Sequence, residues 1–165
     1  MVTLISQTTV EYVALLPAVL ILLIVIFVGI ISDMVGVAAT VAKRETFNAK
    51  AAKKVFGASN TLFLLNHSER VASLMCDIVG DICGTVSGAI GIVIVLRIVN
   101  SWGGSQTVIN LLIIAMVSAL TVGGKAFFKT YGIRKADEII FFVGRILASF
   151  QYIARTIGSN LRGEK

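Results

Sequence analysis

VALLPAVLILLIVIFVGII, residues 13–31, is the stretch that decides the fold class of this chain. No charged side chain interrupts it, and Pro17 lies in its first turns, where a missing amide hydrogen costs least. A helix rises about 1.5 Å per residue, so about twenty apolar residues cross a hydrocarbon core about 30 Å thick. The pattern predicts a membrane-spanning helix over about residues 10–34.

The composition of the whole chain also indicates a membrane protein. Hydrophobic residues make up 56% of the 165 residues and charged residues only 15%, whereas about a quarter of a soluble domain is charged. The length is that of one domain. We expect a single transmembrane domain over residues 1–157, a flexible tail over residues 158–165, and no separate catalytic or nucleotide-binding module.

Two further apolar stretches follow, over about residues 71–99 and 106–124, joined by a short turn that contains Trp102. Amphipathic helices are expected over about residues 43–66, in two pieces joined through residues 57–60, and over about residues 136–157. The predicted fold class is all-α integral membrane, with three transmembrane helices plus a C-terminal amphipathic interfacial helix. A fourth crossing by residues 136–157 stays open.

The basic residues indicate the orientation. The formal net charge is +6, and the connection after the first span is basic, whereas no Lys or Arg precedes that span. Because basic loops stay in the cytoplasm, we expect a multi-pass protein of the cell membrane with its N-terminus outside and its C-terminus in the cytoplasm. Charge beside apolar stretches is a topology signal, so no nucleic-acid partner is expected.

The two cysteines, Cys76 and Cys83, lie on one face of the second span. Two helical turns separate their backbones by roughly 10 Å, and a disulfide needs Cα atoms within about 7 Å. We therefore expect two reduced packing residues. No Ser/His/Asp set, phosphate-binding loop or metal-spaced Cys/His cluster appears, and His67, the one histidine, is expected at the surface. The sequence does not predict an enzyme.

The second span carries a periodic set of glycines, Gly80, Gly84 and Gly88, which recur every four residues. Such a stripe lets another helix backbone approach closely, so it predicts helix packing and a homodimer through this face.

Acidic residues are the main candidates for function. Asp77 and Asp81 lie one turn apart in the second span, and a carboxylate in hydrocarbon costs at least ~2.5 kcal/mol unless protein, water or an ion covers it. We expect an ion or proton site there, or an internal ion pair. Ser32 and Asp33 offer oxygen ligands of the kind that Mg²⁺ prefers, or else they end the first span at the headgroups. Lys125 is expected at a depth similar to the aspartates, unless it extends to the interface.

Several short motifs resemble the transmembrane domain of the cyclin M and CorC family of magnesium transporters, over roughly residues 20–149. Residues 31–33 look like the serine-containing end of its first helix, and residues 51–55 and 66–71 are similar to its Ala-Lys-rich stretch and its entry to the second helix. Gly80-Asp81 falls where the family has Gly-Asn. Residues 124–130, GKAFFKT, fall where it has Gly-Glu-x-x-Pro-Lys-Thr.

The resemblance implies a Mg²⁺ site of Ser, Asn and Glu oxygens near the membrane midplane. Lys125 stands at the glutamate position, and Phe128 at the proline position. In one interpretation of this difference from the family, Asp81 supplies the missing carboxylate, with Ser32, Asp77 and Gly80 as the other candidate metal ligands. In the other, Lys125 occupies the cation position and pairs with Asp81 or Asp77.

The function that follows is divalent cation (Mg²⁺) transport, or descent from such a transporter, with Mg²⁺ as the only candidate cofactor and a homodimer in the bilayer as the expected assembly. The alternative is a transport-inactive membrane scaffold or accessory subunit with an internal Asp-Lys ion pair and a protein partner in the membrane.

Overall fold

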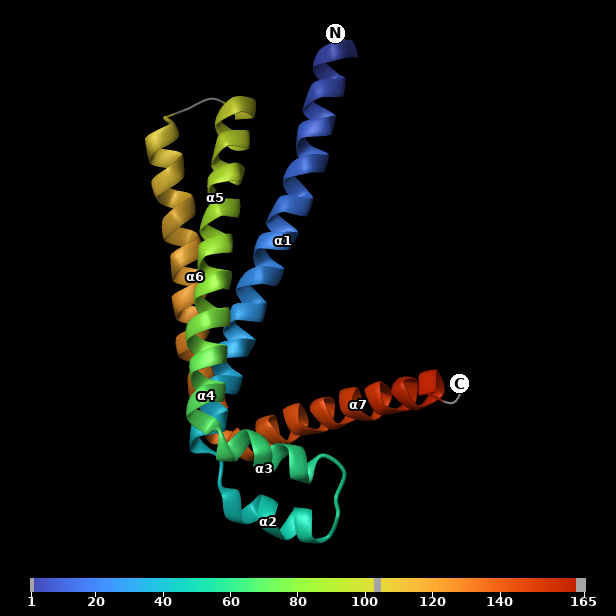
Figure 1. Cartoon of the computed structure of the whole chain (residues 1–165). Coiled ribbons are helices and arrows are strands. Elements are labelled where there is room, and N and C mark those ends of the chain that lie inside the picture. Colours follow the sequence, from blue (N-terminus) through green and yellow to red (C-terminus); the bar gives the residue numbers. More distant parts are fainter. Residues whose placement is uncertain (1, 103–104, 163–165) are drawn as a thin grey trace. The chain divides into compact units, whose positions relative to one another are not determined.

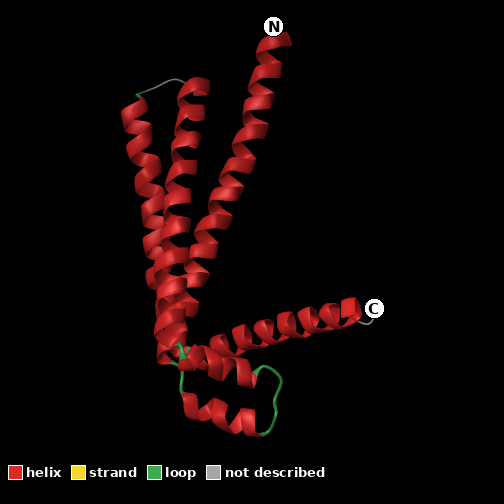
Figure 2. Ribbon diagram, viewed as in Figure 1, coloured by secondary structure: helices red, strands yellow, loops and turns green. Residues whose placement is uncertain are grey.

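The computed structural model describes the backbone of residues 2–102 and 105–162, and the side chains of residues 15–101 and 105–153. Within these ranges the chain contains helices and short connections and no strand (Figure 1, Figure 2). The elements in chain order are α1 (Val2–Val41), α2 (Arg44–Ala52), α3 (Ala58–Asn66), α4 (Ser68–Ala72), the π-helix η1 (Ser73–Val79), α5 (Gly80–Trp102), α6 (Gln106–Arg134) and α7 (Ala136–Arg162).

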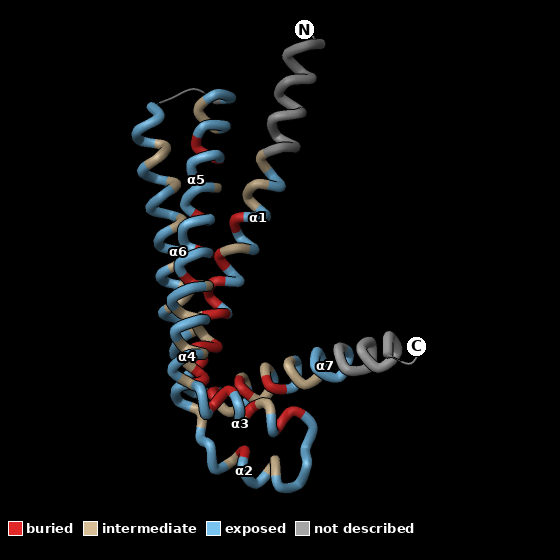
Figure 3. Tube along the Cα trace, in the orientation of Figure 1, coloured by how far each residue is buried: buried red, intermediate tan, exposed pale blue. Residues whose placement is uncertain are grey.

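Among the described residues, three helical stretches are long and apolar enough to cross a membrane: Leu15–Val41, Ser68–Ser101 and Gln106–Arg134. The prediction of an all-α chain with three such helices is confirmed. The shortest stretch has 27 residues and is roughly 40 Å long, more than the roughly 30 Å of a hydrocarbon core. Large apolar side chains stay exposed along these helices, and Figure 3 shows α6 as almost entirely exposed or half-buried. This surface is suited to contact with lipid or with another membrane helix.

The chain divides into two compact units, and the first comprises Met1–Ser32 and Asp77–Phe128. Its core contains Leu22, Ile26 and Ile30, spaced four residues apart on α1, packed with Ile94 of α5. The side chains of α6 join them, and the ring of Phe128 meets that of Phe27 edge to face at a centroid distance of 6.5 Å.

Glycines make the close helix contacts of this first unit. A Cβ added at Gly29 of α1 would lie 2.9 Å from the Cβ of Cys83, and one added at Gly124 of α6 would overlap the side chain of Ile30. Small residues at such crossings let membrane helices approach, because lipid offers no hydrophobic driving force between them.

The second unit comprises Asp33–Cys76 and Lys129–Lys165. Its core contains Ala39, Phe47, Leu64, Leu65 and Ile140, which come from α1, α2, α3 and α7. Gly57 begins α3 with φ of 86°, a left-handed conformation that glycine adopts without the strain of a Cβ. The Oγ1 of the fully buried Thr61 donates to the carbonyl oxygen of Gly57 at 2.9 Å, which satisfies a polar group inside this core.

The helix bounds differ from the sequence prediction at several ends. The connection after α1 holds two helices, α2 and α3, with their joint at residues 53–57. The third spanning helix continues past the predicted end near residue 124 to Arg134, because Gly123 and Gly124 are tolerated inside it and its last turns pack in the second unit. Helix α7 extends to Arg162, so most of the predicted tail is helical, and residues 163–165 lie outside the described residues. The turn at Gly103-Gly104 and the side chain of Trp102 also lie outside them.

Candidate functional site

The two aspartates of the second spanning stretch lie where its helix changes type. Asp77 belongs to η1, a π-helical segment, and Asp81 lies in the first turn of α5. The i to i+5 hydrogen bonds of a π-helix widen the turn, and such segments within α-helices occur frequently at functional sites. The apolar pattern of the sequence has no signal for this change, because a π-turn depends on what packs against the helix.

Packing beside η1 is close. The Sγ of Cys76 lies 3.5 Å from the backbone oxygen of Asp33 and donates to it. A Cβ at Gly36 would overlap this sulfur and would lie 3.3 Å from the backbone oxygen of Ala72, so a larger residue there would force this packing to shift. Both cysteines are free thiols, as predicted, and Cys83 is buried against Gly29. Gly36 therefore makes a close helix contact that the sequence pattern did not predict.

Asp77 and Asp81 are both exposed. Among the residues that the structure describes, neither carboxylate has a hydrogen bond or an ion pair. Gly80 is buried, and it precedes Asp81 by one residue, which is about 100° around a helix. The carboxylates therefore lie away from the packed face of this helix, which carries Gly80, Cys83 and Ser87.

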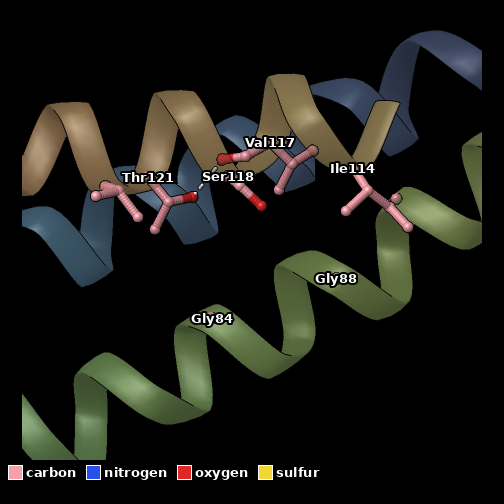
Figure 4. A pocket seen from close by; sticks show the side chains of 8 residues that line it. Gly84, Gly88, Ile114, Val117, Ser118 and Thr121 are labelled. Atoms are coloured by element: carbon pink, nitrogen blue, oxygen red, sulfur yellow. Dashed lines mark hydrogen bonds between the residues drawn. The ribbon is translucent and has the colours of Figure 1, made fainter. Parts of the chain in front are cut away.

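A groove lies between α5 and α6, and its first lining residue on α5, Gly84, follows Asp81 by three residues. Its hollow has a volume of about 190 Å³, and Figure 4 shows Gly84 and Gly88 on one side with side chains of α6 on the other. The lining residues are Gly84, Gly88, Gly91, Ile114, Val117, Ser118, Thr121 and Val122. A Cβ added at Gly84 or Gly88 would meet nothing within 4 Å. The predicted glycine stripe is thus divided: Gly80 is buried, whereas Gly84 and Gly88 line a surface that the described residues leave open.

The acids and the groove share one face of the helix. Asp81, Gly84 and Gly88 are spaced three and four residues apart, the spacing of neighbours on a helix surface. On α6, Lys125 follows Thr121 by one turn, so it continues the groove side of that helix. Lys125 is half-buried and Ser32 of α1 is buried, and both have interaction partners.

The predicted metal ligands are therefore of two kinds. Ser32 and Gly80 are buried, whereas Asp77 and Asp81 are exposed. Within the described side chains, no three His, Cys, Asp or Glu residues lie close enough together to hold a metal ion. The described residues offer two carboxylates on an open face of a helix long and apolar enough to span a membrane, next to a groove lined by glycine.

His67 belongs to the second unit, at the joint of α3 and α4. Its Nδ1 lies 2.9 Å from the carbonyl oxygen of Phe63, and its ring packs on the Phe63 ring at a centroid distance of 4.6 Å. The histidine is exposed, as the sequence predicted.

Comparison with known proteins identifies no relative. No family model, no curated protein and no solved structure matches this chain, and the likeness to the cyclin M and CorC family consists of the sequence motifs described above.

Proposed function

We propose that this chain is a multi-pass protein of the cell membrane that transports Mg²⁺ as a homodimer, in the manner of the cyclin M and CorC transporters that its motifs resemble. In this proposal the N-terminus lies outside and the C-terminus lies in the cytoplasm. One observation carries the proposal: Asp77 and Asp81 are exposed and unpaired, among the described residues, on a helix long and apolar enough to span the membrane.

Exposed carboxylates in such a helix must be shielded from the hydrocarbon of the membrane. Each one costs at least ~2.5 kcal/mol in the hydrocarbon region, and such groups face a protein interior, water or an ion. A divalent cation meets this requirement directly, because carboxylate oxygens are the ligands that hard cations take. Asp81, in the first turn of α5, is the principal anionic ligand in this proposal, with Asp77 beside it.

A second copy of the chain completes the shielding of these carboxylates from lipid. Gly84 and Gly88 leave the groove open enough for another helix to approach its backbone. A two-fold interface brings the same patch of each copy together, so the two aspartate pairs converge. Like charges in a low dielectric repel strongly, and a cation between them removes the repulsion. Dimerisation and cation binding therefore support each other.

Helix α7 is proposed to lie along the inner leaflet. One of its faces packs on α3, where Gly144 contacts Thr61 and Ile140 is fully buried. The large exposed apolar residues of α7 recur at helical spacing: Phe142, Ile146, Phe150 and Ile153. An amphipathic helix of this kind buries its apolar face at the boundary of headgroups and acyl chains.

A transport-inactive scaffold or accessory subunit is the second candidate, and Lys125 favours it. This lysine is half-buried on the groove side of α6, where the resembled family carries a glutamate. In this alternative a lysine ammonium, and not a metal ion, neutralises the two carboxylates. The role of Asp77 and Asp81 would then be to bind the lysine of a partner or of a second copy.

The transport proposal is tested with purified protein in liposomes that contain a Mg²⁺-sensitive dye. The parent is expected to raise the rate of Mg²⁺ entry above that of empty liposomes, and Asp81→Asn is expected to lower it by at least about tenfold, as loss of a charged ligand costs several kcal/mol. Glu45→Gln is the matched control, because it removes one exposed carboxylate from α2, outside the spanning stretches. Its rate should equal that of the parent.

Two outcomes would contradict transport. One is a parent protein that gives no more entry than empty liposomes, and the other is an Asp81→Asn protein that transports as fast as the parent. If, in addition, Asp81→Asn elutes as an aggregate where Glu45→Gln does not, the aspartate holds the assembly together and the scaffold function is favoured. Elution of each variant from a gel-filtration column supplies that comparison.

A further inference from the structure

The second unit contains a polar hollow that the proposed function does not use. It has a volume of about 320 Å³ and lies where the start of α2 meets the joint of α3 and α4. The lining residues are Arg44, Asn66, His67, Ser68, Glu69 and Arg70. Two guanidinium groups, an amide and a hydroxyl thus surround one space, with a single carboxylate among them.

Arg44 is held in place at this hollow. Its Nη2 donates to the carbonyl oxygen of Leu65 at 3.0 Å, so the planar guanidinium is fixed while other N–H donors remain. The Nδ1 of His67 lies 2.9 Å from the carbonyl oxygen of Phe63, and a carbonyl only accepts, so Nδ1 carries the hydrogen. Arg70 is exposed, and no hydrogen bond within the described chain involves its guanidinium. A preoriented arginine with a second one beside it is the arrangement that binds phosphate oxygens.

A second polar hollow in the same unit makes a useful contrast. It has a volume of about 360 Å³ and includes Lys43, Arg134 and Lys135, together with Asp137 and Glu138. Here the carboxylates already have partners: the backbone N–H of Lys43 donates to Asp137 at 2.9 Å, and the Nζ of Lys135 donates to Glu138 at 2.6 Å. The Glu138 carboxylate raises the pKa of Lys135 through this hydrogen bond and its charge. The positive charge of this hollow is therefore partly neutralised within the protein.

The place of Arg44 and Arg70 in the chain indicates where the phosphate comes from. Arg44 follows the end of the spanning stretch Leu15–Val41, and Arg70 lies in the first turn of Ser68–Ser101. Both therefore belong to span ends, which the proposed membrane placement puts at the level of lipid headgroups, where phosphate groups are far more concentrated than in the surrounding solution. We propose that this hollow binds the phosphate of an anionic phospholipid of the inner leaflet, with Arg44 and Arg70 as its ligands. The inference depends on the membrane placement in the proposed function and is independent of ion transport.

The test is native mass spectrometry of the full chain, released from micelles that contain equal amounts of phosphatidylglycerol and phosphatidylcholine. The parent is expected to retain phosphatidylglycerol in preference. Each basic residue near an anionic lipid surface contributes a factor of about five, so Arg44→Gln/Arg70→Gln should lower the preference by at least about tenfold. Lys53→Gln/Lys129→Gln is the matched control. It removes the same charge from exposed positions that line neither hollow, so it should lose less of the preference than the arginine variant.

Arg70→Gln alone provides a variant that is expected to fold, because its guanidinium makes no hydrogen bond among the described residues, and it should lower the preference by about fivefold. The proposal is overturned if the parent shows no preference, or if the lysine control loses as much as the arginine variant. It is also overturned if inorganic phosphate displaces the lipid, since the site would then bind a soluble anion. Mg²⁺ entry plays no part in this readout, so a failure of transport and a failure of lipid binding are separate results.

Discussion

Single glycines carry much of the specificity of this fold, and their surroundings separate them into two kinds. At Gly144 an added Cβ would overlap the hydroxyl of the fully buried Thr61, whereas at Gly123 an added Cβ would meet nothing within 4 Å. Both glycines lie inside long helices, so backbone propensity alone would favour alanine at each by about 1 kcal/mol. The atoms around each glycine therefore decide whether substitution by alanine stabilises or destabilises the protein.

Gly144→Ala is expected to destabilise the contact of α7 with α3 by about 1–3 kcal/mol, because an overpacked site forces side chains and backbone apart. Gly123→Ala is expected to leave stability unchanged or to raise it slightly. Thermal unfolding of the two variants in the same detergent, followed by the loss of soluble folded protein, measures the difference. Equal melting temperatures would show that the Thr61 contact is not tight.

At the scale of elements, the pair α5 and α6 presents a face that no other described residue covers. The groove residues Gly84 and Gly88 have open space before them, and the carboxylate of Asp81 lies on the same face. A stripe of small residues with an acid at one end limits how a second helix can bind. The two backbones meet at the glycines, and the carboxylate requires a cation or a polar partner at its end of the stripe. The proposed dimer therefore depends on space at the glycines as much as on charge at the aspartates.

Gly84→Leu is expected to disrupt the dimer without harm to the single chain, because a leucine there fills the groove and meets no atom of its own unit at the Cβ position. Ala89→Leu is the matched control, since Ala89 is exposed on α5 but does not line the groove. The mass of each variant in detergent, from light scattering after gel filtration, gives the oligomeric state. A dimer that persists in Gly84→Leu would exclude this face as the interface.

At the scale of the whole molecule, the proposed orientation rests on the distribution of charge and on the number of crossings. Three stretches among the described residues are long and apolar enough to span a membrane. The basic residues Lys43, Arg44 and Lys135 lie just beyond span ends, and Arg134 is the last residue of the third stretch. The hydrogen bond to Glu138 raises the pKa of Lys135, so this lysine is charged at neutral pH and counts in the positive-inside balance. In the proposed topology, three crossings with basic loops inside leave the N-terminus outside.

Reporter fusions test this orientation and the placement of α7 together. A reporter that is active only in the cytoplasm is expected to be active after Lys165, and equally active when fused after Lys135, before α7 begins. If α7 lies on the inner leaflet, both fusions report the same side. If α7 crosses as a fourth span, only the shorter fusion will be active, and the interfacial placement will be wrong.

Much of the candidate site could be predicted from the spacing of residues in the sequence. Asp77 and Asp81 lie one turn apart in an apolar stretch, and the cost of a carboxylate in lipid singles them out without any structure. The spacing does not show which way that pair faces. Gly80 is buried while Asp81 is exposed, and this depends on α1, whose residues Gly29 and Ile30 meet the other helices of the first unit.

The sequence by itself determined that the chain is helical and able to span a membrane, because hydropathy and length are properties of each segment alone. It also determined that the two cysteines cannot pair along one helix. Only the tertiary structure decided the rest: the π-helix at Ser73–Val79, the open groove at Gly84 and the gathering of Arg44 with Arg70. The physical reason is that each of these features depends on packing between residues far apart in the chain. The hydropathy of a segment does not depend on which residues pack against it.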